Sequence, residues 1–145
     1  MLNIKEFMTE DHRNCDEIFA QMEDAVASKN GEALSKFEAF QDALTNHFKM
    51  EEMVLFPMFE EKTGMTEGPT KVMVMEHEQM RELVSKMANA IEANNKDKFF
   101  GLSETLMILM QQHNMKEEQM IYTMIQDHLG DDADHIVSRM RTIAQ

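Results

Sequence analysis

The chain has 145 residues, enough for one domain with a hydrophobic core and too few for two. Its five glycines and two prolines are too few for a sandwich or barrel of short strands, whereas 17 methionines and many Glu, Lys, Leu and Ala residues favour helices. A formal net charge of −13 argues against binding to nucleic acid or to an anionic membrane.

No stretch approaches the roughly 20 apolar residues that a membrane-spanning helix needs, and the N-terminus lacks a signal-peptide core. A single cysteine, Cys15, excludes an internal disulfide framework and fits a reducing compartment. We therefore expect a soluble cytoplasmic protein in which residues 1–145 form a single domain.

Four long segments with helical periodicity follow one another along the chain. Their apolar positions, spaced three and four residues apart, run from Met8 to Val26, from Phe37 to Met58, from Met73 to Ile91 and from Leu102 to Met124. The last stripe ends with Met120 and Met124. Turn residues separate them at Lys29-Asn30-Gly31, 63–70 and Asn94-Asn95, and Gly130-Asp131-Asp132 follows the last. A short fifth segment, roughly residues 132 to 143, is expected to cap one end. The pattern predicts an all-α protein, an up-down-up-down four-helix bundle with a short C-terminal fifth helix.

Polar residues occupy six positions on the apolar stripes themselves. Burying a carboxylate without a partner costs several kcal/mol, so the two acids among them need a chemical explanation. The six are His12, His47, Glu51, His77, His113 and Glu117.

The two halves of the chain resemble each other around these positions. Residues 47–58 align with residues 113–124 at an offset of 66, and Asp11-His12 aligns with Glu76-His77 at an offset of 65. Each half has one histidine on its first helix and a His-x-x-x-Glu on its second, a spacing that puts both side chains on one helix face.

The four histidines each lie 17 or 18 residues from the turn that joins the helices of their own half. At about 1.5 Å per residue, all four reach the same level of the core, about 26 Å from that end. A lone histidine on an apolar stripe is more often an ordinary core residue, and a single His-x-x-x-Glu is weak evidence. Duplication and matched depth favour a two-metal site in which each glutamate can bridge both ions.

At these residues the sequence resembles the hemerythrin-like, or HHE cation-binding, family. The resemblance runs from His12 through Glu117, and the segment 55–58 is also typical. It implies a four-helix bundle that holds a non-heme di-iron centre, two Fe ions with carboxylate bridges and an oxo or hydroxo bridge. By that analogy, the ligands would be His12 and His47 on one iron, His77 and His113 on the other, and Glu51 and Glu117 as bridges.

The sequence departs from the oxygen-carrying hemerythrins in two ways. Those proteins carry two histidines four residues apart on the third helix, whereas Met73 and Arg81 lie four residues before and after His77. They also have a His-x-x-x-x-Asp on the fourth helix, whereas the repeat here pairs His113 with Glu117. The four-His, two-Glu pattern is more similar to the branch that includes iron–sulfur repair proteins of the nitric oxide stress response.

With only two histidines each, both irons would keep an open position, which favours chemistry with a small ligand. We expect the protein to bind or reduce O2, NO or peroxide in oxygen sensing or redox stress response, as an enzyme or otherwise. The alternatives are a non-catalytic oxygen-binding or storage protein and an iron-handling protein for storage, delivery or repair. Manganese or zinc could occupy the same ligands. No nucleic acid or membrane is expected as a partner, and the sequence names no protein partner.

Residues beside the stripes have less definite predictions. Asp16 and Arg81 each follow a candidate ligand histidine by four residues. They could pair with each other, orient ligands or form a surface ion pair. Asp16 could also replace one of the metal ligands. Asp11 and Glu76 are expected to face solvent or neighbouring helices, and Glu52 and Glu118 are expected on the surface.

Five other residues each have a prediction of their own. Cys15 is expected to be a small buried residue. Tyr122 matches Phe56 in the repeat, so we expect a packing role, with a radical or proton-transfer role as the alternative. Pro57 predicts a kink just past Glu51. His128 and His135 are expected on the surface.

Overall fold

The computed structural model describes residues 3–29 and 31–144. These residues form ten helical segments joined by short connections. In chain order they are α1 (Ile4–Ser28), α2 (Ala33–Met50), η1 (Glu51–Leu55), α3 (Phe56–Thr63), α4 (Pro69–Glu92), α5 (Lys96–Lys116), η2 (Glu117–Ile121), α6 (Tyr122–Leu129), η3 (Gly130–Asp132) and α7 (Ala133–Ile143).

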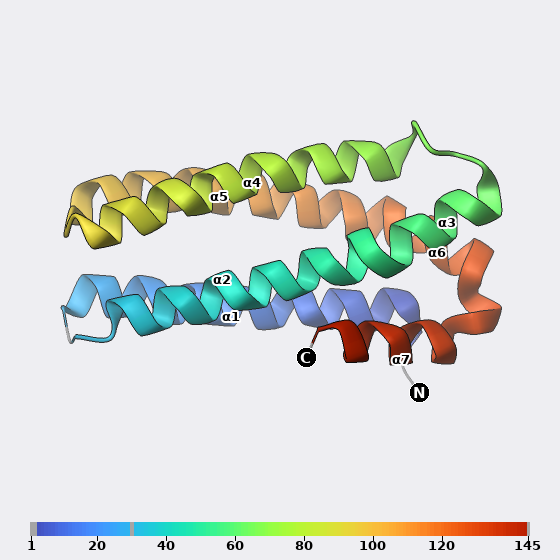
Figure 1. The fold of residues 1–145 in the computed structure, drawn as a ribbon, viewed down its shortest axis with the longest axis horizontal. Helices are drawn as coiled ribbons and strands as arrows, with labels where there is room; N and C mark the ends of the chain where they lie inside the picture. The colour runs from blue at the N-terminus through green and yellow to red at the C-terminus, as the bar shows by residue number, and fades with distance from the viewer. Residues whose placement is uncertain (1–2, 30, 145) are drawn as a thin grey trace.

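The long helices pack as two antiparallel hairpins, α1 with α2 and α4 with α5, and the two hairpins pack on each other (Figure 1). Both hairpin turns lie at the same end of the bundle, and the connection from α3 to α4 lies at the other. Because α2, η1 and α3 continue one another, as do α5, η2 and α6, the four predicted helices are all present. The predicted up-down-up-down bundle is confirmed.

Local sequence signals explain where these helices begin and end. Asn3 and Asn95 cap α1 and α5, each accepting a hydrogen bond from a backbone N–H in the first turn. Gly64, with φ of 76°, ends α3, and Pro69 is the first residue of α4. At the predicted break Lys29-Asn30-Gly31, Lys29 and Gly31 have positive φ, and Asn30 lies outside the described residues.

The C-terminal helix α7 agrees closely with the predicted segment. Its buried residues are Ile136, Val137 and Met140, which lie on one face. They pack against α1, α2 and η1, so α7 covers the side of the first hairpin near the end that holds α3 and α6 (Figure 1). That residues 1–145 form one domain stays a prediction.

Two apolar clusters fill the bundle core at different levels. One lies toward the hairpin turns and includes Phe19, Phe40 and Phe99. The other lies among α3, α6 and α7 and includes Phe59 and Ile125. The six polar residues predicted on the stripes are buried as well and lie close to one another.

Two five-residue π-helical segments interrupt the second and fourth helices at matching places. The backbone N–H of Phe56 donates to the carbonyl of Glu51, and that of Tyr122 donates to the carbonyl of Glu117, five residues back in each case. A π turn contains one more residue than an α turn, so the buried stripe shifts by one position beyond it.

This shift overturns part of the predicted core. The α-helical spacing placed Met120 and Met124 on the buried stripe, but Met120 is 54 % exposed and Met124 is only partly buried. Ile121 and Ile125 are buried instead. The helix irregularity predicted near Pro57 starts earlier, at the π turn, and η2 has the same geometry without a proline.

Candidate metal centre

All six polar residues predicted on the apolar stripes lie together in one layer of the core. Each has at most 3 % of its surface exposed. They come from every long helix: His12 from α1, His47 from α2, Glu51 from η1, His77 from α4, His113 from α5 and Glu117 from η2.

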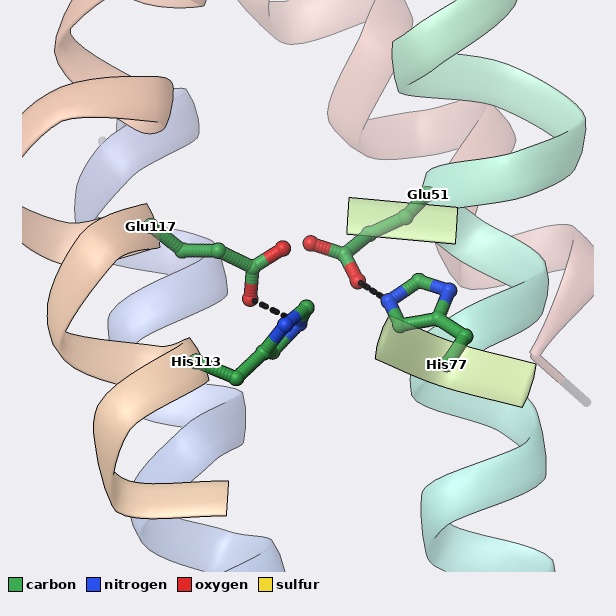
Figure 2. Close-up of side chains that lie close together, drawn as sticks. All are labelled: Glu51, His77, His113 and Glu117. Carbon is green, nitrogen blue, oxygen red and sulfur yellow. Dashed lines mark ion pairs between the residues drawn. The ribbon is translucent and has the colours of Figure 1, made fainter. Parts of the chain in front are cut away.

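The layer divides into two groups of possible ligand atoms. One group is His12, His47 and Glu117, and the other is His77, His113, Glu51 and Glu117. Within each group the atoms lie within 4.8 Å of one another. Figure 2 shows the second group, with the carboxylates of Glu51 and Glu117 facing each other between the two imidazoles. Because Glu117 belongs to both groups, the arrangement suits two ions that share a carboxylate.

Each glutamate contacts histidines of both hairpins. Glu51 Oε1 lies 3.5 Å from Nε2 of His47 in its own hairpin and 3.0 Å from Nε2 of His77 in the other. Glu117 Oε1 lies 3.3 Å from Nε2 of His113 in its own hairpin and 3.0 Å from Nε2 of His12 in the other. The two carboxylates therefore link the halves of the bundle at this level.

Several atoms that face the centre of the layer are buried and form no hydrogen bond. They are Nε2 of His77, Nε2 of His113, Oε1 of Glu51 and Oε2 of Glu117. Leaving such a group unsatisfied costs about 1–3 kcal/mol, so native proteins rarely do it. Imidazole nitrogens and carboxylate oxygens are the donors that bind iron, manganese and zinc. The residues present therefore fit metal ions.

Each of the four histidines also donates a hydrogen bond from Nδ1–H to a carboxylate outside the layer. The pairs are His12 with Glu118 at 2.8 Å, His47 with Asp11 at 2.7 Å, His77 with Glu52 at 2.6 Å and His113 with Glu76 at 2.7 Å. This contact fixes the ring orientation and leaves the Nε2 lone pair directed at the centre.

Asp11 and Glu76 were predicted to face solvent or neighbouring helices, and Glu52 and Glu118 to lie on the surface. Neither prediction includes a bond to a histidine. All four are only partly buried, yet each holds a histidine on another helix. The signal available in the sequence was the repeat, because Asp11 and Glu76 precede matching histidines and Glu52 and Glu118 follow matching glutamates.

Arg81 does not pair with Asp16. Its guanidinium donates to Glu52 at 2.8 Å and to Glu78 at 2.5 Å, and it lies over the ring of Phe48. Arg81 therefore orients the carboxylate that holds His77, one of the alternatives predicted for it.

The two central glutamates have opposite pKa shifts. Burial and then the nearby charge of Glu117 raise the pKa of Glu51. Burial opposes the ionisation of Glu117, but its close contacts with Glu51, His113 and His12 hold the pKa of Glu117 well below its usual range. Glu117 therefore ionises more readily than Glu51.

Tyr122 is the polar neighbour of the layer that sequence reasoning treated as packing. Its side chain is fully buried, and its hydroxyl lies within donating distance of two carboxylates, 2.8 Å from Glu51 Oε2 and 3.0 Å from Glu117 Oε1. The sequence signal was a hydroxyl at the place where the other half of the repeat has Phe56.

The remaining predictions around the site agree with the structure. Cys15 is buried, and burial is the main cause that raises the pKa of its thiol from 9.0 to about 12. His128 and His135 are exposed, as expected.

Residues 3–125 match the model of the hemerythrin HHE cation-binding domain. The chain belongs to the hemerythrin HHE cation-binding family. The match includes all six residues of the buried layer, and this His/Glu cluster fits a site for two metal ions. No curated protein and no solved structure matches the chain significantly. Among the helices of residues 3–29 and 31–144, none combines the length and apolarity needed to cross a membrane.

Proposed function

We propose that this hemerythrin-like protein binds two iron ions in the buried layer and uses them to bind or reduce a small oxidant, namely O2, NO or peroxide. The observation that carries the proposal is the set of buried, unpartnered Nε2 and carboxylate oxygen atoms that face one another across the layer. A bound iron pair would supply open coordination positions and electrons to such a ligand.

The protein's own residues would hold and orient the two ions. His12 and His47 would bind one ion and His77 and His113 the other, with Glu51 and Glu117 as bridges. The four outer carboxylates keep the ligand nitrogens directed inward, and the two bridging charges partly balance two divalent ions.

Burial supports only a small ligand, because each residue of the layer has at most 3 % of its surface exposed. A cavity of about 30 Å³, lined in part by Glu76, Met80, His113 and Lys116, lies beside the layer between α4 and α5. That volume suits a molecule about as large as one water. Lys116 forms an ion pair with Glu76 at this cavity.

The deciding experiment is iron content together with the visible spectrum after anaerobic reconstitution and exposure to air. We expect two irons per chain and the near-ultraviolet absorption of a bridged ferric pair. Protein that takes up no iron, or binds only zinc, would overturn the proposal. Rapid mixing of the reduced protein with NO or peroxide should then give turnover.

The same experiment separates the alternatives. Reversible oxygenation without turnover would instead indicate an oxygen store or sensor, and rapid transfer of iron to an acceptor would indicate iron handling. A cytoplasmic location is part of the proposal, supported by the single, unpaired cysteine.

A further inference from the structure

The hydroxyl of Tyr122 lies among four candidate donor atoms of the buried layer. It is 3.1 Å from Nε2 of His12, 3.3 Å from Nε2 of His47, 2.8 Å from Oε2 of Glu51 and 3.0 Å from Oε1 of Glu117. A tyrosine that served only packing would need one partner for its hydroxyl. This one faces the atoms that would hold an ion.

These distances match the spacing of neighbouring ligands around one ion. In an octahedral site with bonds of about 2.1 Å, adjacent ligand atoms lie about 3.0 Å apart. The phenol oxygen stands 2.8 to 3.3 Å from all four donors, so it occupies the place of a further ligand beside His12 and His47.

The other half of the layer has no such group. Phe56 matches Tyr122 in the repeat, and both follow a bridging glutamate by five residues across a π turn. Their rings are placed alike, since Tyr122 lies 5.5 Å from the ring of His12 and Phe56 lies 6.1 Å from that of His77. A phenylalanine offers no ligand atom, so the two ion positions differ by one oxygen.

The carboxylates that hold the histidines from outside the layer also differ between the two ion positions. Behind His77 and His113, Glu52 and Glu76 form ion pairs with Arg81 and Lys116. Behind His47 and His12, the corresponding acids are Asp11 and Glu118, and neither forms an ion pair with a lysine or arginine within the described part of the chain. The His12 and His47 position therefore has more uncompensated negative charge, which favours an ion of higher charge there.

Resting on the proposed di-iron function, we propose that Tyr122 is a protein ligand of the ion held by His12 and His47. The position left open for O2, NO or peroxide then belongs to the ion held by His77 and His113. Ligation breaks the phenol O–H bond, joins the oxygen to the ion and releases the proton, with no change of oxidation state.

The test is resonance Raman spectroscopy of the ferric protein, which detects an iron-bound phenolate by its ring vibrations. The wild type should show them, and Tyr122→Phe should lose them while keeping two irons per chain and nearly the same melting temperature. The double variant Tyr122→Phe/Phe56→Tyr is the matched control, because it moves the hydroxyl to the other half, and it should regain them.

A second readout is the number of azide ions that bind the ferric protein. The wild type should bind one per chain and Tyr122→Phe two, because the variant frees the second position. Wild type with two irons but no phenolate vibrations, or with two azides, would overturn this inference and leave the di-iron proposal standing. Wild type that binds no iron would overturn both.

Discussion

Glu51 is a fully buried acid whose pKa is raised by burial and by Glu117. Glu51→Gln keeps the shape of the side chain and removes the negative charge that would bridge two metal ions. We expect the metal-free variant to unfold with the same free energy as the wild type or about 1 kcal/mol more, since neutral replacements of buried charges are often tolerated. The iron-loaded variant should hold at most one iron per chain and lose most of the rise in melting temperature on loading.

Iron analysis and thermal melting of the same samples check this prediction. Glu61→Gln, an exposed substitution close in the chain, is the control and should behave as the wild type. Two irons in the Glu51→Gln protein would contradict a bridging role for Glu51.

Asp11 shows how much an outer carboxylate contributes. Asp11→Asn weakens the acceptor for Nδ1–H of His47, so the imidazole becomes a poorer and less well oriented ligand. Loss of such a partner typically costs about 10–100-fold in metal affinity. Competition with a chelator measures it, and the exposed neighbouring variant Glu10→Gln should leave affinity unchanged. Equal affinities in the two variants would refute the positioning role.

The six residues of the buried layer could be predicted from the sequence, but the carboxylates that hold the histidines could not, for a physical reason. Histidine and glutamate are polar, so His12 and Glu117 are conspicuous among the apolar residues of their stripes. Asp11 and Glu118 lie at the edge of a stripe, where any solvated acid can lie, and only the packed helices reveal their partners. The ring of Tyr122 is largely apolar, so the sequence alone predicts a packing role. Only the position of its hydroxyl in the structure reveals its contacts with the layer.

At the level of elements, the π turns position residues that α-helical periodicity would separate. Residues five apart point about 140° away from each other around an α-helix. The wider π turn brings the Tyr122 hydroxyl to within 3.0 Å of Glu117. Backbone bonding of this kind is not encoded in residue type alone, which is why Met120 was predicted in the core and Ile121 was not.

Replacing Pro57 tests whether the proline produces the π turn. Because η2 forms at the matching place with Thr123 where η1 has Pro57, the proline is not required for this geometry. Pro57→Ala should therefore keep two irons per chain and change the free energy of unfolding by no more than about 1 kcal/mol. Iron content and thermal melting check it, and loss of iron would show that the proline sets the position of Glu51.

For the whole molecule, the bundle and its order followed from the sequence because four long periodic stripes leave few ways to bury their apolar faces. The stability of that bundle should depend strongly on metal, since each ion would join both hairpins. An ion at 100 times its dissociation constant adds about 2.7 kcal/mol, and a domain of this size gains about 2–4 °C in melting temperature per kcal/mol. Two ions should therefore raise the melting temperature by about 10 °C or more.

Differential scanning calorimetry with and without iron measures this rise. Because a net charge of −13 would be screened by any divalent cation, magnesium at equal concentration is the control and should have a much smaller effect. Equal shifts with magnesium and iron would mean that the rise reflects surface screening.

The contact of each bridging glutamate with the opposite hairpin has a consequence for symmetry. A single hairpin contains only half of the donors and cannot enclose an ion pair alone, whereas two identical hairpins related by a two-fold axis would supply the full set. The arrangement of the chain therefore corresponds to a homodimer of hairpins in which the two subunits are joined into one polypeptide. Joining them is what permits Tyr122 and Phe56 to differ, because identical subunits can make only equivalent ion positions.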